Sequence, residues 1–321
     1  MSTSYTAPPA APKAVRGPGS PPLRRRLLGA AAMPLAWAAG LVLRLLPRRC
    51  LLPLSRLLAR VLKRLSGRRK SVAERNLRLV YGGALSEEDL HDLLDRVAQH
   101  AALMLLECLW VGASAQRLKD LMDVVGMEHI HEARKLGRGV VLWTAHFGNW
   151  ELAGCRLAVE GLPFFAFIRR RASRLADAAI ERLRRRFGIE PIPLHAGMRT
   201  LARLLRKNFV FGHVADSPAT PEQGQPVDLL GHRCHLWPTA IVLSLMTGAP
   251  VLPAFSWRNP DGRHVVYIHP PITIERKGTA REDIQLNFAK LIPYLEEAIR
   301  CHPEQWAWFY ERWRPDHQPQ D

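Results

Sequence analysis

Alternating apolar and polar stretches predict most of the elements that follow residue 74. Residues 86–110 repeat apolar positions every three or four residues behind Ser86 and two acidic side chains, which predicts a helix with a serine cap. Residues 139–144 form a short apolar run bordered by glycine, which is typical of a buried strand. Asn149 comes just after this run, and we expect it to cap the helix that follows.

The same alternation continues toward the end of the chain. It predicts strands over 164–168, 209–214, 251–257 and 265–269, and helices over 175–187, 198–207, 238–247 and 284–300. Repeated exchange of strand and helix favours an α/β fold whose central sheet is covered by helices on both faces. In such folds the chemistry lies in loops that leave the strand ends.

The first 70 residues have a different composition. Residues 1–26 are rich in proline and end in three arginines, which predicts a disordered basic tail. The uncharged run from Leu27 to Leu43 is just long enough to cross a bilayer, although Pro34 interrupts it. We therefore expect an uncleaved anchor or a re-entrant segment there. The predicted division is a tail at 1–26, a membrane-attachment segment at 27–70, a catalytic domain at 71–315 and a tail at 316–321.

Residues 51–65 alternate leucine with basic residues at helical spacing. Four basic residues share one face and leucines populate the other, which predicts an amphipathic helix lying in a membrane interface. The basic residues are Arg56, Arg60, Lys63 and Arg64. A helix that packs on the core and exposes a solvated basic face is the alternative. The neighbouring apolar run favours the membrane interpretation.

The net charge of +17 is concentrated at one end of the 321-residue chain. Fifteen of the 46 Lys and Arg residues precede Glu74, the first acidic residue, so the remainder is close to neutral. The basic segment is therefore an arm suited to an anionic membrane surface, and it lacks nucleic-acid recognition motifs. Five isolated cysteines without a Cys-x-x-Cys pair indicate a reducing compartment, which places the body on the cytoplasmic side.

Several common signatures are absent from the sequence. There is no Gly-x-Ser-x-Gly elbow, P-loop, Gly-x-Gly-x-x-Gly or His-Glu-x-x-His motif. His232, Cys234 and His235 are spaced too tightly for the usual zinc sites, so we assign them hydrogen-bonding or packing roles. We expect neither a metal nor a cofactor.

One histidine stands in a context that suggests catalysis. His146 ends the predicted buried strand, and Glu151 lies in the first turn of the next helix. About one such pair is expected by chance, so the spacing alone carries no weight. The context places an imidazole in a cleft above the sheet, with a carboxylate near enough to fix its tautomer and stabilise its protonated form. A strand-capping histidine and a helix-terminal glutamate remain the alternative.

The stretch GRGVVLWTAHFGNWELAG, residues 137–154, resembles the first block of the lipid A secondary acyltransferases within the wider glycerolipid acyltransferase group. Further matches over residues 35–315 are Arg75-Asn76-Leu77, Arg169, Asp177, Arg186, Gly188, Asp216, Gly231, Thr247-Gly248-Ala249, Val251-Leu252-Pro253, Pro303-Glu304-Gln305-Trp306, Trp308 and Arg312. The resemblance implies a mixed sheet covered by helices, an N-terminal membrane helix, and a location at the bacterial inner membrane. Three segments depart from the family pattern: Ile168-Arg169-Arg170, Ser173 and Asp216-Ser217. These departures leave the acceptor lipid and the acyl chain open.

The resemblance also implies roles for site residues. His146 would be the general base on an acceptor hydroxyl, with Glu151 as its partner. Backbone N–H groups of Gly148 and Asn149, helped by Arg169, would stabilise the oxyanion, and Asp216 would line the substrate site. The donor would be acyl carrier protein or acyl-CoA, and the acceptor a lipid. The candidates for docking an anionic donor or a lipid phosphate are Arg170, Arg171, Arg174 and Arg185.

Other interpretations stay open. The same fold and base would suit a lysophospholipid, ornithine-lipid or other membrane-lipid acyltransferase that uses acyl-CoA. A non-catalytic protein that binds anionic membranes through its arm is a third possibility, and the Arg169–Arg186 cluster could be only a solvated helix face. The intact block from His146 to Glu151 favours an enzyme.

Overall fold

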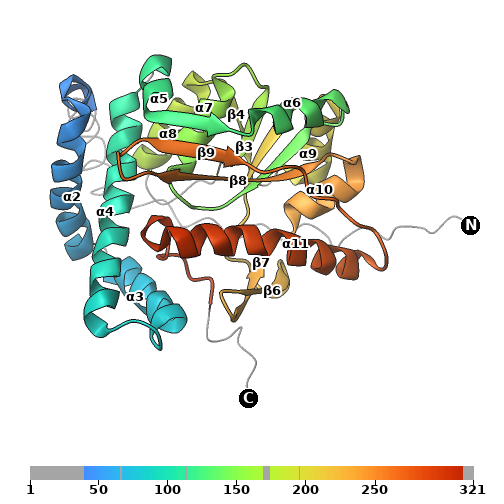
Figure 1. Ribbon diagram of the computed structural model, residues 1–321. Coiled ribbons are helices and arrows are strands. Elements are labelled where there is room, and N and C mark those ends of the chain that lie inside the picture. The colour runs from blue at the N-terminus through green and yellow to red at the C-terminus, as the bar shows by residue number, and fades with distance from the viewer. Residues whose placement is uncertain (1–39, 66, 113, 169–173, 195, 314–321) are drawn as a thin grey trace, which may run out of the picture.

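The computed structural model describes residues 40–65, 67–112, 114–168, 174–194 and 196–313. Within them, a seven-stranded sheet has the order β1-β9-β8-β2-β5-β3-β4, and β6 and β7 form a separate hairpin (Figure 1). The strands are β1 (Met122–Val125), β2 (Val140–Thr144), β3 (Phe164–Ile168), β4 (Ile189–Pro193), β5 (Val210–Val214), β6 (Gln225–Leu229), β7 (His232–Leu236), β8 (Val251–Arg258) and β9 (His264–Ile268). Neighbours pair in parallel except at β8–β9, so the predicted mixed α/β sheet is confirmed.

Helices cover the sheet, as the alternation predicts. They are α2 (Leu51–Leu65), α3 (Gly67–Tyr81), α4 (Glu87–Val111), α5 (Ala115–Leu121), α6 (Met127–Lys135), α7 (Trp150–Ala158), α8 (Arg174–Arg186), α9 (Gly197–Arg206), α10 (Thr239–Thr247) and α11 (Ala280–Cys301), with 3₁₀ turns η1 (Arg48–Cys50) and η2 (Pro303–Gln305). The two predicted caps are confirmed: the Ser86 side chain accepts from the Asp89 N–H, and the Asn149 side chain accepts from the Leu152 N–H.

Some strands escape a prediction from hydrophobic pattern. β4 contains Pro191 and Pro193, and proline within a run of residues normally argues against a strand. The sheet tolerates it because β4 is an edge strand, paired on one side only with β3. The short strand β1 occupies the opposite edge.

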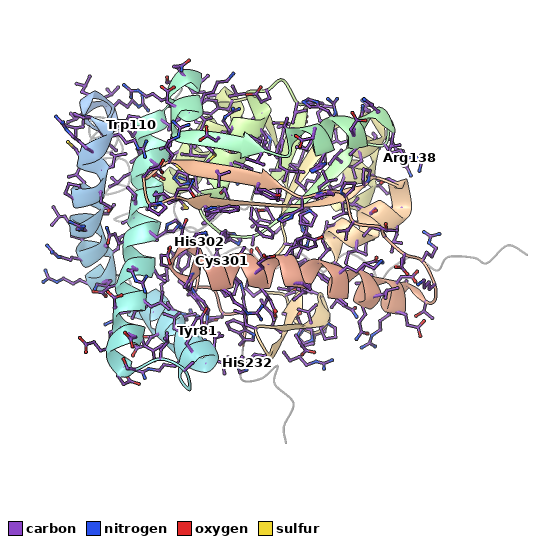
Figure 2. The ribbon with its side chains drawn as sticks, in the orientation of Figure 1. Tyr81, Trp110, Arg138, His232, Cys301 and His302 are labelled. Atoms are coloured by element: carbon purple, nitrogen blue, oxygen red, sulfur yellow. The ribbon has the colours of Figure 1, made fainter. Side chains whose placement is uncertain are left out.

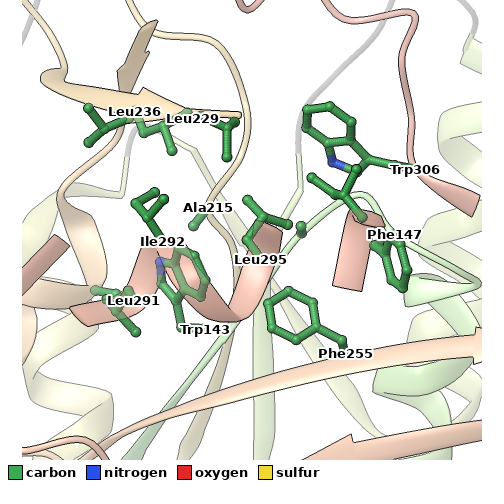
Figure 3. Packing of buried hydrophobic residues seen from close by; sticks show 14 of the residues in the cluster. Trp143, Phe147, Ala215, Leu229, Leu236, Phe255, Leu291, Ile292, Leu295 and Trp306 are labelled. Atoms are coloured by element: carbon green, nitrogen blue, oxygen red, sulfur yellow. The ribbon is translucent and has the colours of Figure 1, made fainter. Parts of the chain in front are cut away.

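Strand β2 lies at the centre of the sheet and is buried on both faces. Val141 and Trp143 pack in the core between the sheet and α11, whereas Val140 and Leu142 pack in a second core on the opposite face of the sheet. Figure 3 shows Trp143 beside Phe255 of β8 and facing side chains of α11. Burial on both faces explains why this strand is a continuous apolar run instead of an alternating one.

Helix α2 lies along α4 at one end of the molecule (Figure 1). Its buried positions are Leu51, Ser55 and Ala59, while Leu52 and Leu57 are 45% and 58% exposed. The helix therefore packs on the body, as the alternative interpretation expected, and it also exposes apolar side chains; its contact with a membrane stays a prediction.

The described part of the chain contains no helix with the length and apolar character needed for a membrane crossing. Most of the predicted anchor from Leu27 to Leu43 lies outside the described residues, as do the predicted tails at 1–26 and 316–321.

Candidate active site

The loop between β2 and α7 carries His146 and is fixed on both sides. An antiparallel bridge joins Phe147 to Trp306, the Gly148 N–H donates to the Gln305 carbonyl at 2.9 Å, and the Ala307 N–H donates to the His146 carbonyl at 3.0 Å. Gly148 has a φ of +58°, and a Cβ there would lie 1.7 Å from the Ser256 carbonyl oxygen of β8. Only glycine fits such a close approach.

The His146 imidazole is bound by Asp216. Its Nδ1 lies 2.7 Å from Oδ1 of Asp216, and the same oxygen accepts the His146 backbone N–H at 2.9 Å. A carboxylate only accepts, so Nδ1 carries the proton and Nε2 is left as the basic nitrogen. Asp216 follows β5, the parallel neighbour of β2, and the two residues therefore emerge at the same edge of the sheet.

Asp216 is itself held by the segment that follows α11. Its Oδ2 accepts from Arg312 Nη2 at 2.5 Å and from Trp306 Nε1 at 2.9 Å, and its backbone carbonyl accepts from Arg312 Nε at 2.8 Å. Burial alone would raise the pKa of the Asp216 carboxyl, but Arg312 and His146 hold that pKa well below its ordinary value. Asp216 is therefore ionised at physiological pH and provides a negative charge beside the imidazole.

Aromatic rings enclose the imidazole. The His146 ring lies 4.5 Å from that of Tyr310 and 5.0 Å from that of Trp150, measured between centroids, and its side chain is 9% exposed. The buried Arg312 guanidinium stacks over the Trp306 ring at 4.0 Å. Solvent thus reaches only a small part of the imidazole.

The sequence predicted that Glu151 would be the carboxylate partner of the His146 imidazole, but in the structure Glu151 binds Arg184. Its buried carboxylate binds Arg184 of α8 through both oxygens, at 2.8 and 2.9 Å, and Trp150 Nε1 donates to it at 3.2 Å. Burial would lower the pKa of Arg184, but Glu151 raises it overall. The first turn of α7 carries Glu151 toward α8, while the sheet brings Asp216 to Nδ1 of His146 from 70 residues away.

The other predicted site residues fall into three groups. The Gly148 N–H, expected as an oxyanion donor, is engaged by Gln305, whereas the Asn149 side chain caps α7 and donates to Glu107. Arg169, Arg170 and Arg171 lie outside the described residues. Arg174 begins α8, and Arg185 further along it is exposed and pairs with Glu181.

The three residues that suggest a zinc site, His232, Cys234 and His235, belong to β7. Cys234 packs in the core beneath α11, and burial raises the pKa of its thiol to about 12. The His232 ring packs near Trp313, 6.2 Å between centroids.

Sequence reasoning alone did not assign Trp306, Tyr310 and Arg312 to the site. They follow α11, which ends beside α4 at Cys301 and His302 (Figure 2). The chain then crosses the strand ends and reaches Asp216, a return that no local pattern encodes. The available signals were the resemblance noted at residues 303–306, Trp308 and Arg312 and the Trp-rich composition of residues 303–313.

The arrangement can accept a proton from a hydroxyl group. A histidine with a fixed Nδ1–H and a charged carboxylate behind it has the arrangement that general-base catalysis requires, and its loop starts a helix at the carboxyl edge of a parallel pair. Fold and site together define an α/β protein with a histidine–carboxylate pair at the carboxyl ends of parallel strands.

The chain belongs to the family of bacterial lipid A biosynthesis acyltransferases, whose sequence model matches residues 23–315. It is 27% identical over 204 residues to a phosphatidylinositol mannoside acyltransferase of Mycolicibacterium smegmatis, covering 62% of this chain and 65% of that protein. It is 23% identical over 199 residues to a lipid A biosynthesis acyltransferase of Haemophilus influenzae, covering 62% and 61%. A lipid A biosynthesis lauroyltransferase of Escherichia coli is 24% identical over 261 residues, covering 80% and 83%. The chain thus spans less than two thirds of the first two relatives.

Proposed function

We propose that the protein transfers a fatty acyl chain from an acyl thioester to a hydroxyl of a lipid A-type glycolipid precursor. Membership of the family supports the reaction class. Relatives named for lipid A biosynthesis support the acceptor class. The observation that carries the proposal is the 2.7 Å hydrogen bond between His146 Nδ1 and Asp216 Oδ1, since it prepares Nε2 to take a proton.

In this mechanism Nε2 of His146 removes the proton from the acceptor hydroxyl as its oxygen attacks the thioester carbonyl. The negative Asp216 stabilises the imidazolium that forms. The tetrahedral intermediate then collapses, the carbon–sulfur bond breaks, and Nε2 returns the proton to the leaving thiolate. No covalent acyl-enzyme is needed.

Several residues support this chemistry in the proposal. Glu151 fixes Arg184 and thereby the packing of α7 on α8. The Asn149 N–H and Arg169 take the oxyanion role, because the Gly148 N–H is already engaged. Four arginines bind either the anionic acyl donor or a phosphate of the lipid acceptor: Arg170, Arg171, Arg174 and Arg185. We propose that the donor is acyl carrier protein.

We further propose that the chain works at the cytoplasmic face of the bacterial inner membrane. Leu41, Val42 and Leu45 precede α2 and are exposed, Leu45 by 84%, and they lie within the strongly basic segment that precedes Glu74. Apolar side chains beside arginines suit the boundary between headgroups and acyl chains of an anionic leaflet.

The direct test is acyl transfer by the purified protein, with acyl carrier protein or coenzyme A thioesters as donors and a lipid A precursor as acceptor. The His146→Ala variant should lose about 10²- to 10⁴-fold in turnover, because a positioned general base contributes that much. His131→Ala, which alters an exposed histidine, is the matched control. Retention of more than a few per cent of turnover by His146→Ala would exclude the mechanism.

A second acceptor class has its own support. The Mycolicibacterium smegmatis relative is named for acylation of a phosphatidylinositol mannoside, so another membrane lipid could be the acceptor. Mass spectrometry of lipids from a deletion strain separates the two: loss of a secondary chain from lipid A supports the first, and an altered phospholipid or aminolipid with intact lipid A supports the second. Tight binding to anionic vesicles without transfer from any thioester would indicate a non-catalytic protein.

A further inference from the structure

A cluster of ionisable side chains is buried behind the catalytic loop and takes no part in the proposed chemistry. It consists of Glu107 and His100 of α4, Arg258 of β8 and His264 of β9, hereafter the Glu107 cluster. Glu107 is 3% exposed, His100 8% and His264 0%. Burying charged groups costs desolvation free energy, which is offset only when the groups are paired, so we asked which function this cluster could serve.

Glu107 is the centre of the cluster. Arg258 binds both of its oxygens, at 3.1 Å through Nε and 2.8 Å through Nη2, and His264 Nε2 lies 3.1 Å from each of them. Burial by itself would raise the pKa of Glu107, but His264 and Arg258 bring that pKa well below its ordinary value. The carboxylate is therefore a fixed negative charge.

Two side-chain hydrogen bonds join this cluster directly to the catalytic loop. Asn149 Nδ2 donates to Glu107 Oε2 at 3.0 Å, and His100 Nε2 lies 3.1 Å from the Gly148 carbonyl oxygen. Arg258 can only donate, so it gives a hydrogen bond to Nδ1 of His100 at 3.2 Å, and the ring proton must sit on Nε2, facing Gly148. Burial and then Arg258 lower the pKa of His100 to about 3, which keeps this tautomer neutral at physiological pH.

The same cluster also holds the opposite side of the loop through Gln305. The Arg258 N–H donates to Gln305 Oε1 at 2.7 Å, Gln305 Nε2 donates to the Arg258 carbonyl at 3.0 Å, and the Gln305 carbonyl accepts the Gly148 N–H. Hydrogen bonds thus hold both the N–H and the carbonyl group of Gly148, which lies two residues after His146.

We infer that Glu107 and His100 are positioning residues: through Asn149 and Gly148 they set the loop that aims His146 and starts α7. The inference rests on the proposed function of His146. A catalytic group that is misplaced by about 1 Å can lose about 100-fold in rate, which is the scale of effect expected here.

The test uses full-length protein and compares Glu107→Gln with His100→Leu. Glu107→Gln keeps the side-chain shape but removes the charge. His100→Leu removes the bonds to the Gly148 carbonyl and to Arg258 Nη1 while leaving the Glu107–Arg258 ion pair in place. Each should lower kcat by about 10- to 100-fold with the KM for the acyl donor little changed. Each should also change the rate at which diethyl pyrocarbonate modifies His146, followed by mass spectrometry of that peptide.

Asp283→Asn is the matched control. Asp283 is a buried carboxylate of α11 that accepts from the Lys277 and Gly278 N–H groups, so its loss should reduce stability and leave kcat and His146 modification unchanged. The inference is overturned if folded Glu107→Gln and His100→Leu keep parental kcat, or if their activity falls only in proportion to the folded fraction while His146 modification stays constant. Active His146→Ala would instead remove the proposed function itself.

Discussion

At the scale of single residues, the site depends on one negative charge kept deep in the protein. Asp216 is fully buried and binds an arginine, an indole and the imidazole at once. The pKa of its carboxyl is low because Arg312 and His146 outweigh the effect of burial, and not because of its place in the sequence. An imidazole without such a partner would be free to adopt either tautomer.

We expect Asp216→Asn to lower kcat by about 10²- to 10⁴-fold, because the amide cannot stabilise the imidazolium. The variant also leaves the buried Arg312 without its counter-charge, which should reduce the free energy of unfolding by about 3–5 kcal/mol. Steady-state kinetics and urea unfolding measure the two effects separately. Asp228→Asn, on the exposed side of β6, should change neither. Parental kcat in folded Asp216→Asn would show that the imidazole works without its carboxylate.

At the scale of elements, two segments from the ends of the chain frame the body. The stretch after α11 packs through Trp306, Trp308 and Trp313 into the core beneath α11, which fixes it as part of the site. At the other end, α2 packs on α4 and exposes leucines on its remaining surface. The first segment completes the site. We propose that the second meets the membrane together with the exposed Leu41, Val42 and Leu45 before it.

Replacing Leu52 and Leu57 together with glutamate should weaken binding to vesicles containing anionic lipid by at least about tenfold. Both side chains are exposed, so the fold should tolerate the change, while the lost apolar contact and the added negative charge oppose membrane binding. Sedimentation with vesicles measures the partition.

The control for that experiment is Leu136→Glu. Leu136 is 61% exposed and follows α6, which lies across the molecule from α2 (Figure 1). Equal partition of all three proteins would show that α2 is not the membrane contact.

At the scale of the whole molecule, burial of titratable groups makes stability depend on pH. Burial lowers the pKa of His100 to about 3 and that of His213 to about 4, so the folded chain resists protonation that the unfolded chain accepts near pH 6.5. The depressed pKa values of Glu107 and Asp216 act in the same direction at lower pH. Stability is therefore greatest above about pH 6.5 and is lost as the pH falls.

Replacing His213 with leucine should flatten this dependence. The wild-type protein should lose on the order of 2 kcal/mol through His213 between pH 7 and pH 5, and the variant should lose that much less. Urea unfolding at the two pH values gives the difference, with His131→Leu, an exposed position, as control. An unchanged difference between pH 7 and pH 5 would show that His213 titrates normally.

The sequence by itself determined the elements that have a local cause. The helix caps at Ser86 and Asn149, the apolar run of β2 and the alternation of strands with helices all follow from side chains and their near neighbours. The sequence also predicted that His146 stands in a loop at the end of a buried strand, as the structure shows. Strand β4 was missed, since its prolines are acceptable only at a sheet edge, which is a property of the assembled sheet.

Only the tertiary structure decided which carboxylate serves the imidazole. Glu151 is five residues from His146 in sequence, yet Asp216 binds Nδ1, because parallel pairing of β2 with β5 aligns their ends. Arg312 and the Glu107 cluster reach the same loop from residues far away in sequence. Local pattern fixes what each segment becomes, whereas the order of strands in the sheet fixes which distant side chains meet, and that order is a cooperative result of packing the whole core.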